Sequence, residues 1–146
     1  MKKLVVIMMM VGATAMATDQ SFNVSLKLFK PITITKVQDL LIPQATLTGS
    51  AFDIVVATSD SGAAAFNAQG GKSRTITRSV VESTIDLSAS GVSGKIAVDN
   101  FVLAGPTAFD ASGNANGLKV GATAHVLAAS EDGDYSGSAT MRVIYN

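Results

Sequence analysis

Apolar and polar residues alternate with a period of two along most of this chain. Residues 21–29 show the pattern most clearly: Phe22, Val24, Leu26 and Leu28 share one face, and the other carries Asn23, Ser25 and Lys27. Strict alternation over such a stretch is typical of a half-buried β-strand. No segment carries the three-to-four-residue spacing of an amphipathic helix. We therefore predict an all-β protein.

Further strands are predicted where β-branched residues fall between clusters of Gly, Ser, Asn and Asp. The Gly- and Asn-rich residues 111–117 are expected to form a loop, and residues 63–66 at most one helical turn. Short strands with regular turns indicate an immunoglobulin-like β-sandwich, a single domain over residues 31–146. The predicted strands cover residues 32–35, 45–47, 52–58, 74–81, 84–87, 94–103, 118–128 and 135–145.

Pro31 separates residues 21–29 from the next strand, because proline has no N–H to donate to a ladder. Two interpretations of residues 21–29 stay open. The segment is either a donor strand that leaves its own domain or the first strand of a closed, monomeric sandwich. When extended, it reaches about 30 Å, the height of a sandwich. Burying its four large apolar side chains would contribute about 6–12 kcal/mol before entropy losses.

Residues 1–17 have the pattern of a secretory signal peptide. Lys2 and Lys3 precede an apolar run at residues 4–11, and Ala15 and Ala17 form an A-x-A cleavage site. The run is shorter than the roughly 20 residues that span a bilayer, and a short N-terminal anchor is the alternative interpretation. No second such apolar stretch follows, so no membrane span is predicted in the mature chain. We expect an exported protein with residues 18–30 as an N-terminal extension.

Composition removes several classes of function. The 11 Lys and Arg residues balance 11 Asp and Glu residues, which leaves no cationic surface for nucleic acid. The chain has no Cys, which excludes disulfides, thiolate metal sites and cysteine nucleophiles. Its one histidine, His125, is predicted to be an exposed or sandwich-edge strand residue. We expect no catalytic residues, no metal site and no cofactor, and the protein is predicted not to be an enzyme.

Two polar loops are candidates for weak calcium binding. Asp110, Ser112, Asn114 and Asn116 resemble the first half of a calcium loop, but Gly121 stands where the bidentate acid belongs. An Asx turn, in which side chains bond their own backbone, explains the same residues. An acidic cluster at residues 131–134 is expected to be a solvated hairpin turn.

The C-terminal strand carries a pattern with two fixed positions. Gly133 is the fourteenth residue from the end, Tyr145 is penultimate, and alternating residues between them share a face. This strand resembles the C-terminal signature of bacterial chaperone–usher pilin subunits. The residues on that face are Gly133, Tyr135, Gly137, Ala139, Met141, Val143 and Tyr145.

A second resemblance spans most of the mature chain. Residues 32–35 followed by Asp39 and Leu40, together with residues 80–83 and 133–137, resemble a family of small secreted bacterial proteins known only as a domain of unknown function. That resemblance implies no particular activity.

The pilin resemblance implies a sandwich that lacks its last strand, leaving a groove that another subunit fills by donor-strand complementation. It implies that Phe22, Val24, Leu26 and Leu28 are the donor residues, and that the C-terminal strand is the groove edge to which a chaperone binds. The implied partners are copies of the chain or sister subunits, a periplasmic chaperone and an outer-membrane usher. The chain would pass through the periplasm and become a structural subunit of a cell-surface fibre. The alternative is a monomeric binding module, periplasmic or surface-exposed, that completes its own sheet.

Overall fold

The computed structural model describes residues 16–146, and these contain strands but no helix. The predicted all-β class is confirmed. The strands are β1 (Thr33–Gln38), β2 (Phe52–Val56), β3 (Ala64–Gln69), β4 (Ile76–Val80), β5 (Ile85–Ser88), β6 (Lys95–Ala104), β7 (Asn114–Val126) and β8 (Met141–Tyr145).

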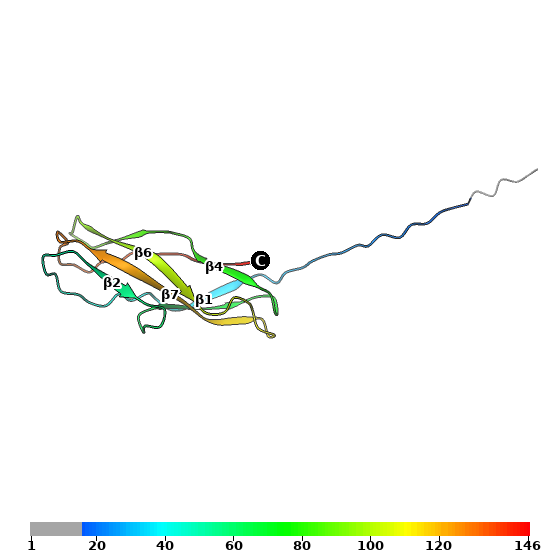
Figure 1. Ribbon diagram of the computed structural model, residues 1–146, viewed down its shortest axis with the longest axis horizontal. Coiled ribbons are helices and arrows are strands. Elements are labelled where there is room, and N and C mark those ends of the chain that lie inside the picture. The colour runs from blue at the N-terminus through cyan, green and yellow to red at the C-terminus, as the bar shows by residue number, and fades with distance from the viewer. Residues whose placement is uncertain (1–15) are drawn as a thin grey trace, which may run out of the picture.

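Six strands form one large antiparallel sheet around the long strand β7 (Figure 1). The order is β1-β3-β7-β6-β5, and β2 also pairs with β7. β3 takes the first half of one edge of β7, and β2 takes the second half. Gly121 lies at this division, where a Cβ atom would stand 2.3 Å from the carbonyl oxygen of Val56. Glycine is therefore required for the two strands to share the edge.

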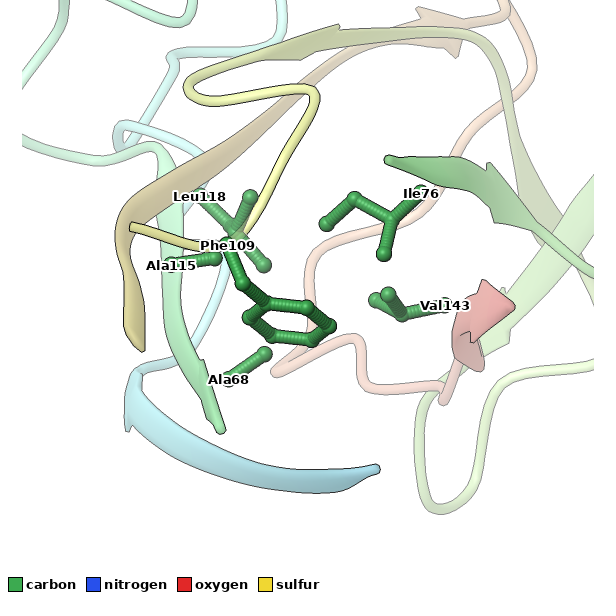
Figure 2. Packing of buried hydrophobic residues seen from close by; sticks show 6 residues of the cluster. All are labelled: Ala68, Ile76, Phe109, Ala115, Leu118 and Val143. Atoms are coloured by element: carbon green, nitrogen blue, oxygen red, sulfur yellow. The ribbon is translucent and has the colours of Figure 1, made fainter. Parts of the chain in front are cut away.

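The second sheet is small and consists of β4 and β8. It packs over one end of the large sheet, where Ile76 and Val143 face Leu118 across the ring of Phe109 (Figure 2). We call this cluster the closed core; it comprises Ala68, Ile76, Phe109, Ala115, Leu118 and Val143. A second cluster lies further along the large sheet and is called the open core; it comprises Ile96, Val98, Ala122, Ala124 and Val126.

The structure corrects several local expectations. Residues 63–66 do not form a helical turn, because most of them belong to β3, which is paired on both sides by β1 and β7. Small alanine side chains suit this buried central strand, so tertiary packing overrides their helix propensity. Residues 111–117 are only partly a loop, since β7 already begins at Asn114. Residues 45–47 are not a strand.

Residues 16–30 form an exposed segment without regular structure, and residues 21–29 pair with no strand in this chain. The segment leaves the body at the end where the C-terminus lies and points away from it (Figure 1). Most of the expected signal peptide, residues 1–15, lies outside the described residues. Within residues 16–146, no helix has the length and apolar character to cross a bilayer.

Candidate functional site

An apolar groove of about 490 Å³ opens over the middle of the large sheet. Its floor consists of inward-facing side chains of β3, β6 and β7, namely Ala64, Phe66, Val98 and Val120. The volume falls in the range of pockets that enclose a sizeable apolar ligand. The floor is part of the molecule's hydrophobic interior, and the groove is a place where that interior lacks a complete second layer.

The two walls of the groove consist mostly of irregular segments; only Met141, the first residue of β8, belongs to a strand. Residues 39–42 form one wall, and their position is fixed by the bond from the Leu41 amide to the Gly62 carbonyl, at 2.7 Å. Residues 135–141 form the other wall, beside Ile85 and Leu87 of β5. Several apolar side chains around the groove are only half-buried: Leu40, Ile42, Ile85, Leu87, Phe101, Tyr135 and Met141.

The C-terminal wall is held on one side and free on the other. Ser136 exchanges two backbone hydrogen bonds with Ser88, each 2.9 Å long. Glu82 accepts hydrogen bonds from the Thr140 amide at 2.7 Å and from the Thr140 hydroxyl at 2.9 Å. The hydrogen bond from the backbone amide of Thr140 is the main reason that the pKa of Glu82 is lowered. Within residues 16–146, no backbone hydrogen bond fixes residues 137–139 between these anchors, and β8 pairs with β4 alone.

The structure divides the predicted groove-edge residues into two groups. Four of them line the groove, whereas Val143 belongs to the closed core and Tyr145 packs against that core from outside. Gly133 lies near Ala89 and does not line the groove. The four groove-lining residues are Tyr135, Gly137, Ala139 and Met141.

The predicted donor residues are unburied in their own chain. Phe22 and Val24 are each 83% exposed, Leu26 is 81% exposed and Leu28 is 76% exposed. Large apolar side chains in a row at such exposure are unfavourable in water and are typical of surfaces that bind a partner. The chain thus carries an apolar groove and, separately, an uncovered apolar ribbon.

Comparison with known families identifies the domain. The family described as Domain of unknown function (DUF4402) matches residues 32–145. The chain belongs to this family. The match confirms the second of the two resemblances and leaves the N-terminal extension outside the DUF4402 domain. No curated protein and no solved structure matches the chain.

His125 of the DUF4402 domain lies on the outer face of the large sheet, between two carboxylates that sequence reasoning missed. Nδ1 is 2.7 Å from Asp53 Oδ1 on β2, and Nε2 is 2.8 Å from Asp99 Oδ1 on β6. The hydrogen bonds to Asp99 and then to Asp53 raise the pKa of His125. Donating to both requires both ring nitrogens to be protonated. Neither nitrogen then has a free lone pair, so the arrangement suits a structural cation and not a general base.

The candidate calcium loop of the DUF4402 domain is built as an Asx turn. Asp110 Oδ1 accepts the amide of Ser112 at 2.8 Å and the amide of Asn114 at 2.9 Å. These hydrogen bonds lower the pKa of Asp110, and the bond from the Asn114 amide has the largest effect. Among the residues the structure describes, no cluster of three or more His, Cys, Asp or Glu side chains is arranged to hold a metal ion.

Proposed function

We propose that this protein is an exported structural subunit of a bacterial surface fibre, assembled by donor-strand complementation. In this proposal the domain is a pilin-like, immunoglobulin-like sandwich that lacks one strand. Residues 21–29 of one copy fill the groove of the next. One observation carries the proposal: a single chain has an apolar groove, whose C-terminal wall leaves the backbone of residues 137–139 without hydrogen bonds in the described part of this chain, and an exposed ribbon with the alternation of a strand.

The chemistry of the two surfaces is complementary. The groove is lined mainly by aliphatic and aromatic side chains, and the ribbon presents Phe22, Val24, Leu26 and Leu28 from one face. The opposite face of the ribbon carries Asn, Ser and Lys, which suits the solvent side of an added strand. Burial of the four apolar side chains would contribute about 6–12 kcal/mol before entropy losses.

The free backbone of the C-terminal wall supplies the second half of the interaction. An added strand satisfies unpaired N–H and C=O groups at a sheet edge and thereby removes an aggregation-prone surface. Before assembly, the same edge and groove need a temporary occupant. A periplasmic chaperone fits this role, and an outer-membrane usher would then exchange the chaperone for the next subunit.

The deciding experiment places a charge on the apolar face of the ribbon. The chain is expressed from its full coding sequence, recovered after export, refolded over a range of concentrations and analysed by size-exclusion chromatography. The unaltered chain should form a concentration-dependent ladder of oligomers. Leu26→Asp should abolish the ladder, since a carboxylate cannot enter an apolar groove without a partner.

The matched control is Ser25→Asp, which adds the same charge one residue away on the polar face. It should leave the ladder intact. A ladder that survives Leu26→Asp would refute strand donation. An unaltered chain that remains a stable monomer with a protected N-terminal segment would favour the self-completing module instead.

A further inference from the structure

We propose that Tyr145 and Phe29 form a latch that keeps the N-terminal extension out of its own groove and presents it to a second copy of the chain. This inference rests on the proposed function and adds a positioning device to it. It assigns to Tyr145, which lies outside the groove, a role in assembly at the root of the donor segment.

The contacts of the latch are specific. The ring of Phe29 stacks on the ring of Tyr145, with centroids 5.1 Å apart and planes inclined by 27°. The Tyr145 hydroxyl accepts the Gly71 amide at 2.7 Å and donates to the carbonyl of Lys30. One hydroxyl therefore ties the root of the extension to the loop that follows β3, using both its acceptor and its donor capacity.

Tyr145 is itself held firmly by the closed core. Its ring meets Phe109 edge-on, with centroids 5.9 Å apart and an interplanar angle of 61°. Gly70 leaves the space for both rings, because a Cβ atom there would stand 2.5 Å from the Phe109 ring and 2.7 Å from the Tyr145 hydroxyl. The latch is thus attached to the end of the molecule that contains the closed core.

Two cations complete the surroundings of Phe29. The guanidinium carbon of Arg74 lies 5.3 Å from the ring centroid, and the Lys27 ammonium lies 5.0 Å from it. Both distances are within cation–π range. Phe29 is 45% exposed, well below the four donor residues before it. The boundary between the latched and free parts of the extension therefore falls between Leu28 and Phe29.

Position and chain length explain what the latch does. None of Phe29, Tyr145 and Arg74 lines the groove, whereas Met141, at the other end of β8, does. A free extension has residues 29–31 available for the turn back along β8, and a hairpin connection needs about 2–5 residues. When Phe29 and Lys30 are held, the turn must consume donor residues. A tether too short to span its site gives almost no effective concentration, so insertion into the chain's own groove is suppressed.

The test measures where the extension goes. Lys27 is the diagnostic trypsin site, because Lys30 precedes Pro31 and resists cleavage. Full-length chain recovered after export is refolded, separated into monomer and oligomer, and digested. Phe29→Ala should raise the fraction of monomer with a protected Lys27 by about two- to tenfold, the range that the loss of one stacked aromatic pair supports. Tyr145→Phe, which removes only the hydroxyl bonds, should act in the same direction.

Phe29→Tyr keeps the ring stack, so it should give the same fraction of monomer with a protected Lys27 as the unaltered chain. None of these variants should change the melting temperature of the monomer by more than a few degrees. If Phe29→Ala leaves the fraction of monomer with a protected Lys27 unchanged while Leu26→Asp still abolishes the oligomers, the latch is overturned and the proposed function stands. If trypsin cleaves at Lys27 in both the monomer and the oligomers of the unaltered chain, the latch and the proposed function are both overturned.

Discussion

The two hydrophobic clusters rest on the same large sheet yet differ in how completely they are covered. The closed core has six buried residues and five partly buried apolar neighbours, whereas the open core has five buried residues and eight partly buried neighbours. The small sheet of β4 and β8 accounts for the difference, because it supplies Ile76 and Val143 to the closed core only. Incomplete burial in this protein thus comes from a missing layer and not from a poorer apolar sequence.

The largest expected effect separates the two clusters by stability. Phe109 is 3% exposed in the closed core, so Phe109→Ala should lower the free energy of unfolding by about 3–5 kcal/mol. Phe101 is half-buried at the groove, so Phe101→Ala in the single subunit should cost about 1 kcal/mol, roughly half the value of full burial. Urea unfolding in the Leu26→Asp background keeps both proteins monomeric.

The same two substitutions should differ again once the groove is filled. In oligomers, Phe101→Ala should become more damaging than in the monomer, because a donor strand would complete the burial of Phe101. Phe109→Ala should lower the free energy of unfolding by a similar amount in the monomer and in the oligomers. If the two substitutions lower the free energy of unfolding of the monomer equally, the open core is already complete.

A smaller effect concerns the C-terminal wall of the groove. Glu82→Ala removes the acceptor of the Thr140 amide, and hydrogen exchange of that amide should become faster. Since the folded-state pKa of Glu82 is lowered below 4.5, the contribution of this bond is present above pH 4.5 and is lost as the pH falls through the lower folded value. Asp132→Ala, at an exposed turn, is the matched control and should leave the exchange unchanged.

The smallest effect lies on the outer face, away from both clusters. The folded-state pKa of His125 is raised above 6.5, so its ion pairs stabilise the fold fully below pH 6.5 and this contribution is lost as the pH rises through the folded value. The difference in melting temperature between the unaltered chain and His125→Gln should shrink between about pH 5.5 and about pH 9. A difference that grows with pH would contradict the assignment of His125 as a cation held by Asp53 and Asp99.

The sequence predicted the all-β class because alternation is a local signal, readable strand by strand. It failed at β3, where Ala64 and Ala65 have high helix propensity and become strand residues only through pairing with β1 and β7. Local reasoning also predicted a loop before Leu118, although β7 begins at Asn114. Which strands pair is a long-range property, and a short window of sequence does not contain it.

The candidate site also has one part that the sequence predicts and another that only the fold brings together. The ribbon of Phe22, Val24, Leu26 and Leu28 could be recognised from alternation alone, and the structure leaves these residues outside every sheet of the chain. The contact of Tyr145 with Phe29 joins positions 116 residues apart and has no local signal. The Asp53–His125–Asp99 group likewise depends on the register of β2 and β6 against β7.

The extension leaves one end of an elongated body, roughly along its long axis (Figure 1). A tensile load applied to the extension would therefore enter the body obliquely to β7, so that only part of it would act along that strand. Under that part of the load, the ladder bonds of a sheet must shear together and cannot unzip one after another. Mechanical toughness would then come from strand orientation, in a chain that has no disulfide to reinforce it.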